Sequence, residues 1–253
     1  MAKLRFHFLG LAHLETHKKN SACAYTQKIV KLAKMIKSYG HTIYFYGVEG
    51  SEVECDEFIQ ISTQEILNRT YGNYDRSKNF FQQDPNDLAH QTFNQNAVKA
   101  ILERKQERDI LLCPMGTYQK PVSDAVNLLT IESGIGYTGV FSSHRVFESY
   151  AWMHYIYGLL NIQDGVWYDA VIPNYFELND FPYQPVKQDY LIYFGRIINR
   201  KGVQIASQIA KETGNQLYIV GQGSLDNANE GLNLSSEKHI IYKPAVGPEE
   251  RAE

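Results

Sequence analysis

The feature that most constrains this chain is a regular alternation of short apolar runs with longer segments of helical periodicity. The run Leu4–Leu9 ends at Gly10, and in the segment 21–39 apolar residues recur with the helical period before Gly40. Strands that alternate with helices predict a parallel sheet with helices on both of its faces. The chain is therefore expected to fold in the α/β class.

Two such units are expected, because the alternation stops at 176–187, where prolines and acidic residues are scattered, and then begins again. The elements expected before this linker are strands at 4–9, 42–46, 109–113, 128–131 and 170–172 and helices at 21–39, 84–104 and 145–158. Those expected after it are strands at 190–194, 216–220 and 239–242 and a helix at 202–213. The polar segment 47–84 gives no clear element, although Asp84-Pro85 at its end is a typical helix start. The sequence thus predicts two Rossmann-like domains, a nearly complete one over 1–170 and a partial one over 171–253.

Charge and cysteine usage exclude several kinds of protein. A formal net charge of -3 over 253 residues, with both signs mixed along the chain, gives no strong attraction to nucleic acid. The three cysteines, Cys23, Cys55 and Cys113, lie far apart, so neither a disulfide framework nor a metal site is predicted. The N-terminus lacks the apolar core of a signal peptide, and no apolar run reaches the roughly 20 residues of a membrane span. We therefore expect a cytoplasmic protein without a transmembrane segment.

The strongest motif for ligand binding is Gly-Arg-Ile-Ile-Asn-Arg-Lys-Gly at 195–202, which follows an expected strand and opens an expected helix. In α/β sheets ligands bind outside the carboxyl ends of the strands, and a helix N-terminus offers free N–H groups and partial positive charge. Arg196 can hold a phosphate through two hydrogen bonds, and Lys201 adds a second cation. These groups suit a diphosphate leaving group, whose developing charge they would stabilise. The alternative is two solvated cations at a helix start.

From about Val171 onward the chain resembles the family 4 retaining glycosyltransferases, which have the two-domain GT-B fold. The resemblance lies in YLIYFGRIINRKGVQIASQIAKETGNQLYIVGQG at 190–223, in the preceding VIPNYFE and in the trailing VGPEERAE. It implies a sugar-nucleotide-dependent transferase whose donor site is completed beyond Glu253, so that the second domain would be truncated here. It also implies that a nucleotide diphosphate sugar binds without a metal or other cofactor.

The resemblance assigns roles residue by residue in the second domain. Gly195, Arg196 and Lys201 would bind the donor diphosphate. Gly221, Gly223 and Tyr242 would shape the loop near the nucleotide.

The first domain is expected to supply the acceptor side of such a site. The candidates are Gly10, His13, Asn20 and Ser21 in the loop after the first strand, and Gly134 and Arg145 in or after a later glycine-rich loop. Asn20 and Ser21 are also natural helix caps, so a structural role is the alternative for them. Glu132, expected at a strand end before the glycine-rich loop, and His144, which follows that loop, are the candidate catalytic residues.

The glycine-rich loop itself, GIGYTG at 134–139, matches the dinucleotide fingerprint G-x-G-x-x-G. That fingerprint belongs in the first strand-to-helix turn, with an acidic residue about 20 residues later. This copy follows a late strand and has no acidic residue at 155–158. An NAD-dependent enzyme is therefore the less favoured hypothesis.

The favoured hypothesis is an enzyme that transfers a sugar, with retention of configuration, to an acceptor that is a glycan, a lipid or a small molecule. A third hypothesis is a non-catalytic or split fragment. Because a partial parallel sheet exposes apolar surface, such a fragment would pair with a complementing C-terminal polypeptide or with a second copy as a homo-oligomer.

Overall fold

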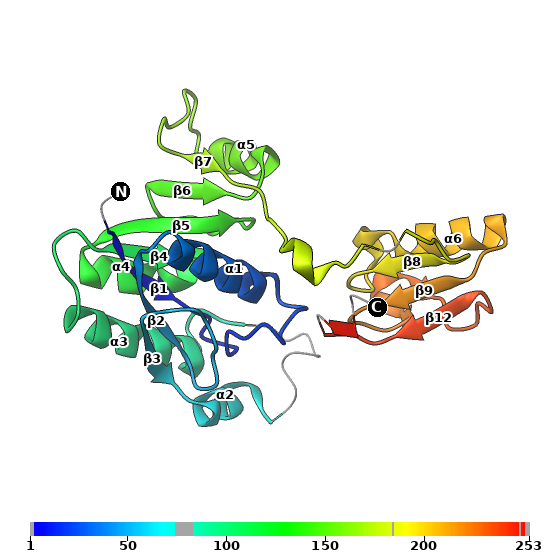
Figure 1. Cartoon of the computed structure of the whole chain (residues 1–253), viewed down its shortest axis with the longest axis horizontal. Coiled ribbons are helices and arrows are strands. Elements are labelled where there is room, and N and C mark those ends of the chain that lie inside the picture. Colours follow the sequence, from blue (N-terminus) through cyan, green and yellow to red (C-terminus); the bar gives the residue numbers. More distant parts are fainter. Residues whose placement is uncertain (1–2, 74–82, 184, 248, 251–253) are drawn as a thin grey trace. The chain divides into compact units, whose positions relative to one another are not determined.

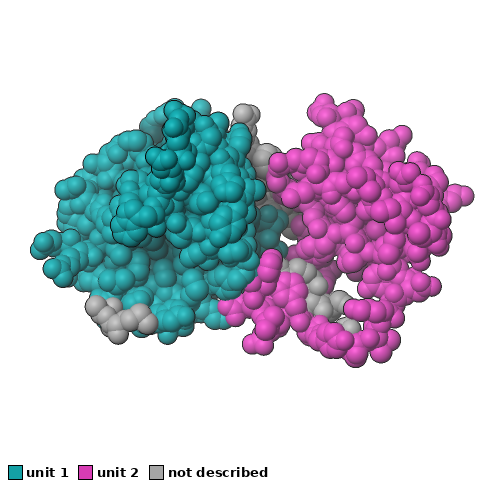
Figure 2. Space-filling view, turned by 90° about the horizontal axis from the view of Figure 1, so that it is seen from above, with its two compact units in different colours: residues 1–74, 81–175 teal, residues 75–80, 176–253 magenta. Residues whose placement is uncertain are grey.

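The computed structural model describes residues 3–73, 83–183, 185–247 and 249–250. The chain divides into two compact units (Figure 2), the first formed by residues 1–74 and 81–175 and the second by residues 75–80 and 176–253. Each unit has its own sheet and its own hydrophobic core, so the two are described separately.

The first unit is built on a seven-stranded parallel sheet with the order β3-β2-β1-β4-β5-β6-β7. Its strands are β1 (Arg5–Leu9), β2 (Thr42–Val48), β3 (Glu57–Ser62), β4 (Ile110–Cys113), β5 (Leu129–Ile135), β6 (His144–Phe147) and β7 (Ala170–Val171). The strand order changes direction between the neighbours β1 and β4. In doubly wound sheets the crevice for ligands lies at such a switch point, outside the carboxyl ends of the strands.

Helices cover both faces of this sheet (Figure 1). They are α1 (Ala24–Ser38), α2 (Gln64–Tyr71), α3 (Leu88–Leu102), α4 (Lys120–Val126) and α5 (Tyr150–Leu159), with a short 3-10 helix, η1 (Gly116–Gln119). Successive residues of β1 point to opposite faces. Phe8 packs in the core formed with Ile29 of α1, whereas Leu9 packs in the core formed with Phe93 of α3. The alternation of apolar residues along a central strand therefore fixes which helices cover which face.

The second unit has a three-stranded parallel sheet of order β12-β9-β8. Its elements are η2 (Leu178–Asp180), β8 (Leu191–Phe194), η3 (Asn199–Lys201), α6 (Val203–Thr213), β9 (Leu217–Val220), the hairpin strands β10 (Asp226–Asn227) and β11 (Leu232–Asn233), η4 (Ala228–Glu230) and β12 (Ile240–Lys243). Leu191 and Tyr193 of β8 pack with Val203 of α6. Ile192 and Phe194, which alternate with them, are 58% and 52% exposed. Helix α6 therefore covers one face of this sheet, and the other face presents apolar side chains.

The expected α/β fold class is confirmed by the parallel sheets, but several element boundaries were wrong. Helix α3 begins at Leu88 rather than after Asp84, because the carboxylate of Asp87 accepts the backbone N–H of His90 and caps the helix, while that of Asp84 accepts the N–H of Asn86. The segment predicted as one helix from Arg145 starts as strand β6, and α5 begins only after Ser149, whose hydroxyl caps it.

Two further expectations differ from the structure. Helix α1 begins after Cys23, so neither Asn20 nor Ser21 is its N-cap. The polar segment that gave no clear element contains β3 and α2. Strand β3 lies at the edge of the sheet, where one face and one side meet solvent, and its polar residues hid it from a hydrophobicity-based prediction.

Across the described ranges of the chain, the structure contains no helix that is long and apolar enough to cross a membrane.

Candidate functional site

The loop that follows β8 carries the motif expected to bind a diphosphate. Its backbone is tied to the neighbouring strand-to-loop junction, since the N–H of Gly195 donates to the carbonyl of Val220 at 3.0 Å and that of Ile197 to the carbonyl of Gln222 at 2.8 Å. Between β8 and α6 the chain forms η3, which ends at Lys201. Arg196 is half-buried and Lys201 is exposed. The structure thus places both cations in the strand-to-helix connection at the carboxyl edge of the second sheet.

Helix α6 begins without a side-chain cap. Its N-cap is Gly202, whose φ of 75° lies in the left-handed region that favours glycine, and no side-chain hydrogen bond caps this end. The first N–H groups of a helix have no partner within it and carry partial positive charge. An uncapped N-terminus beside Lys201 is therefore an arrangement that attracts an anion.

The second glycine loop packs directly on the first. A Cβ at Gly221 would lie 1.8 Å from the carbonyl oxygen of Gly195, so only glycine fits there. Gly223 forms a parallel bridge with Ile197. The hydroxyl of Tyr242, from β12, donates to the carbonyl of Gly223 at 3.0 Å. The residues expected near the diphosphate and near the nucleotide therefore gather at one edge of the second sheet.

In the first unit, the loop after β1 lies at the switch point between β1 and β4. The carbonyl of Gly10 accepts a hydrogen bond at 2.8 Å from the side chain of Gln119, which follows β4. His13 is 4% exposed, and burial lowers its pKa to about 3, so its ring is neutral. Asn20 binds the carbonyl of Glu15 within the same loop at 2.8 Å, and Ser21 lies in the turn before α1.

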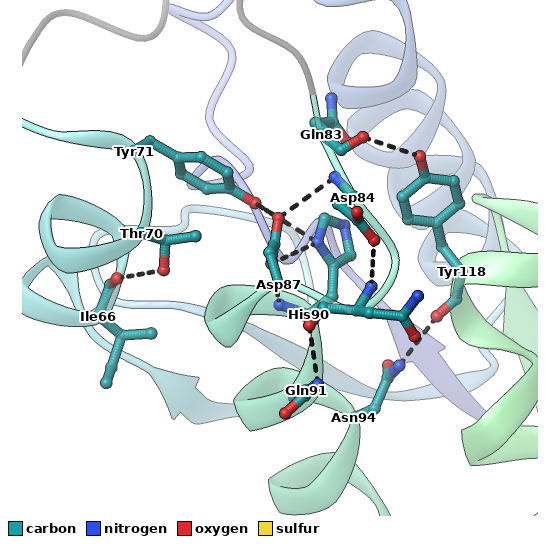
Figure 3. Close-up of polar contacts among 11 residues, drawn as sticks. Ile66, Thr70, Tyr71, Gln83, Asp84, Asp87, His90, Gln91, Asn94 and Tyr118 are labelled. Carbon is teal, nitrogen blue, oxygen red and sulfur yellow. Dashed lines mark hydrogen bonds and ion pairs between the residues drawn. The ribbon is translucent and has the colours of Figure 1, made fainter.

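The sequence analysis did not identify a polar cluster beside this loop (Figure 3). The imidazole of His90 lies 6.1 Å from that of His13 and 4.9 Å from the ring of Tyr118, measured between centroids. Asp87 binds His90 Nδ1 at 2.9 Å and accepts a hydrogen bond of 2.6 Å from the hydroxyl of Tyr71. The signal that could have found this cluster is the spacing Asp87–His90, which puts an acidic cap and an imidazole in one helical turn.

Glu132 lies inside the sheet rather than at a strand end, because β5 continues to Ile135. Its carboxylate is fully buried and accepts the backbone N–H groups of Phe141 and Ser142 at 2.9 and 2.7 Å. Burial raises the pKa of Glu132 to about 7, and these hydrogen bonds limit that rise because they favour the charged form. Through these hydrogen bonds, Glu132 holds the loop 136–143, which connects β5 to β6.

His144 and Arg145 begin strand β6, so they lie toward the amino end of that strand. Arg145 is 6% exposed and makes a two-pronged ion pair with Asp169, with contacts of 2.8 and 3.2 Å. The ring of His144 stacks on Tyr168 at 4.8 Å. Both residues therefore have partners within the unit, away from the carboxyl edge where ligands bind in this fold.

The motif GIGYTG does not open a helix. Gly134 and Ile135 belong to β5, and the next regular element is strand β6. The carbonyl of Gly134 accepts a hydrogen bond of 2.9 Å from Lys28 of α1. Because the dinucleotide fingerprint needs a strand-to-helix turn, this segment lacks the geometry of an NAD site.

No group of three or more histidine, cysteine, aspartate or glutamate side chains suited to a metal ion occurs among the residues that the structure describes.

The chain matches no protein-family model and no curated protein. Among solved structures it is similar to AviGT4, a glycosyltransferase involved in avilamycin A biosynthesis, with a TM-score of 0.61 and 14% sequence identity. The match covers 98% of this chain and 65% of AviGT4, so this chain spans about 65% of the length of the structure it matches. At this identity, the likeness shows that the chain shares its fold with a glycosyltransferase.

Proposed function

We propose that this chain transfers a sugar from a nucleotide diphosphate sugar to an acceptor, with retention of configuration. The observation that carries the proposal is the uncapped N-terminus of α6, preceded by Arg196 and Lys201 in one strand-to-helix connection. A similar fold in a glycosyltransferase supports it. The family 4 resemblance of this segment adds the retaining outcome and the GT-B arrangement of two domains over 1–170 and 171–253.

In this proposal the second unit binds the donor. Gly195, Arg196 and Lys201 hold the diphosphate, whose charge grows as the bond to the sugar breaks. Cations and helix N–H groups stabilise such a leaving group without a proton donor or a metal. The adjacent wall of the proposed donor site, against which the nucleoside lies, is formed by Gly221, Gly223 and Tyr242.

The first unit supplies the acceptor side. We assign Gly10 and His13 to it, since their loop lies at the switch point between β1 and β4. Asn20, Ser21 and Gly134 shape the loops around it. The internal partners of Glu132, His144 and Arg145 favour supporting roles over direct participation in the reaction.

A transfer screen tests this function. Several UDP- and GDP-linked sugars are incubated with the chain and with neutral glycan, lipid and small-molecule acceptors, and the anomeric configuration of any product is determined by NMR. We expect release of the nucleoside diphosphate together with a product of retained configuration. Product of inverted configuration, or nucleotide binding confined to NAD, would contradict the proposal.

A second candidate is a split enzyme that works only with a partner chain. The exposed face of the second sheet, with Ile192 and Phe194 more than half exposed, favours it. In parallel sheets both faces are normally covered. Running the screen with and without a complementing C-terminal polypeptide separates the two candidates, because only the split enzyme gains turnover from the addition.

A further inference from the structure

The cluster around His90 lies outside the donor site proposed above. His90 stands in the first turn of α3, Asp87 caps that helix, Tyr71 ends α2, and Tyr118 belongs to η1 (Figure 3). The side chain of Asn94, one turn further along α3, donates to the carbonyl of Tyr118 at 2.9 Å. Two helix ends and the segment after β4 therefore hold these side chains in place.

Asp87 fixes the orientation of the imidazole. One carboxylate oxygen accepts the backbone N–H of His90 at 2.8 Å and lies 2.9 Å from Nδ1 of the same residue. Burial alone would raise the pKa of Asp87, but the hydrogen bonds from Tyr71 and His90 lower it below its usual value. An ionised carboxylate only accepts hydrogen bonds, so Nδ1 carries the proton that it donates to Asp87, and Nε2 is left to form a hydrogen bond elsewhere.

Nε2 of His90 has no protein partner within the described part of the chain. His90 is 1% exposed, and its Nε2 atom is buried without a hydrogen bond. Buried polar atoms in native proteins are nearly always paired, and an exception points to a bound water or ligand. An oriented imidazole nitrogen without a partner suits a hydroxyl group, which can both donate and accept a hydrogen bond.

The charges of the described residues in this cluster disfavour an anion. The hydrogen bonds and ion pairs of Asp84, Asp87 and His90 with other described residues involve no lysine or arginine. The half-buried ring of Tyr118 lies 4.9 Å from His90, and aromatic rings of this kind can pack against the apolar face of a sugar. Within this described part of the chain, a negatively charged ligand group would meet the carboxylate of Asp87, which is paired with no lysine or arginine.

We propose that this cluster is a subsite for a neutral polyhydroxyl ligand, whose hydroxyl group forms a hydrogen bond with Nε2 of His90 while its ring lies near Tyr118. This assignment rests on the proposed function, in which the ligand is the acceptor. The acceptor is then a neutral sugar or polyol rather than an acid or a phosphate. Asp87 is a positioning residue that acts through His90.

The test measures binding and needs no turnover. A panel of neutral methyl hexosides, together with the matching hexose phosphates, is titrated into the full chain, whose histidine side chains are labelled with ¹⁵N. We expect neutral hexosides to shift the Nε2 resonance of His90 and to bind more tightly than the matching phosphates. His90→Asn, which can still reach Asp87 but lacks the Nε2 atom, should weaken binding about twofold to tenfold, as loss of one hydrogen bond implies.

Matched variants separate this role from a folding defect. Asp87→Ser keeps a good N-cap residue but is too short to orient the imidazole, so it should weaken hexoside binding while the melting temperature is nearly retained. His154→Asn makes the same substitution at an exposed position of α5 and should leave binding unchanged. Absence of His90-dependent hexoside binding across the panel, or tighter binding of the phosphates, would overturn the proposal.

Nucleotide binding measured on the same samples keeps the two proposals apart. If nucleotides bind and hexosides do not, this inference fails alone. If hexosides bind through His90 and nucleotides do not bind, the proposed function fails and the subsite stands.

Discussion

The hydroxyl of Tyr242 donates a hydrogen bond to the backbone carbonyl of Gly223 at 3.0 Å, linking the last strand of the second sheet to the glycine loop after β9. A second, longer contact of 3.4 Å joins the same hydroxyl to the carbonyl of Gly221. The loop packs on the strand-to-helix connection that carries Arg196. Tyr242 therefore holds the glycine loop that forms part of the proposed nucleotide wall.

Replacing Tyr242 with phenylalanine removes this hydroxyl and keeps the ring. We expect the glycine loop to loosen and the affinity for UDP or GDP to fall about twofold to tenfold, the value of one hydrogen bond. Calorimetric titration measures the change. Tyr39→Phe, at a tyrosine that is 65% exposed, is the control; equal affinities of wild type and Tyr242→Phe would show that the hydroxyl is dispensable.

Gly221→Ala should destabilise the second unit. The added Cβ would lie 1.8 Å from the carbonyl oxygen of Gly195, and backbone on both sides must move to admit it. We expect a loss of about 2 kcal/mol or more in the free energy of unfolding, as for overpacked sites. Chemical denaturation gives this value, and Gly247→Ala, where nothing lies within 4 Å, provides the comparison. Equal stability of the two variants would contradict the close packing of the two loops.

The strand-to-helix connection between β8 and α6 could be predicted from the sequence, because the residues that indicate it are close together in the chain. Strand, glycine, cations and helix follow one another within 24 residues, from Tyr190 to Thr213. The helix observed there differs from the expected one by a single residue at its start. The contact between Gly221 and Gly195 joins residues from two strand ends, and the parallel pairing of β8 with β9 brings them together.

The His90 cluster could not be predicted in the same way. Its members come from the ends of α2 and α3 and from η1, and α2 was not recognised in a segment of high polarity. The misplaced start of α3 at Asp84 also hid Asp87 as the cap. The expected place of Glu132 at a strand end was wrong for a related reason, since sequence gives strand lengths poorly and β5 extends to Ile135.

Glu132 makes the stability of the first unit depend on pH. Its pKa is raised to about 7 in the folded chain, above its ordinary value, so the folded state holds a proton that the unfolded state releases. The contribution of Glu132 to the free energy of unfolding is fully present below the pKa that Glu132 has in the unfolded state. This contribution is lost as the pH rises toward the folded-state pKa of about 7. The wild type should therefore lose on the order of 3 kcal/mol across this window relative to Glu132→Gln, which does not titrate. Unfolding curves of both proteins between pH 4 and 8 check this; parallel pH profiles would contradict it.

The open face of the second sheet should drive self-association. Ile192 and Phe194 lie side by side along one face of β8, exposed by 58% and 52%. We expect sedimentation to show association that Phe194→Lys weakens, because burying a charge opposes the contact. The control is Ile205→Lys, at an isoleucine that is 64% exposed on α6, the helix that covers the other face of the sheet. A wild type that stays monomeric at every concentration would refute this interface.

The most direct test of the proposed donor site compares diphosphate with nucleoside binding in variants of the two cations. Calorimetry of UDP against uridine, and of GDP against guanosine, is performed on wild type, Arg196→Ala and Lys201→Ala. Lys211→Ala, at the far end of α6 and paired with Glu237, is the control. Arg196→Ala and Lys201→Ala should each weaken diphosphate binding about tenfold to a hundredfold, as loss of a charge-assisted phosphate contact implies. Both should leave nucleoside binding almost unchanged. Equal losses for diphosphate and nucleoside, or no loss for either, would contradict the assignment of this loop to the donor diphosphate.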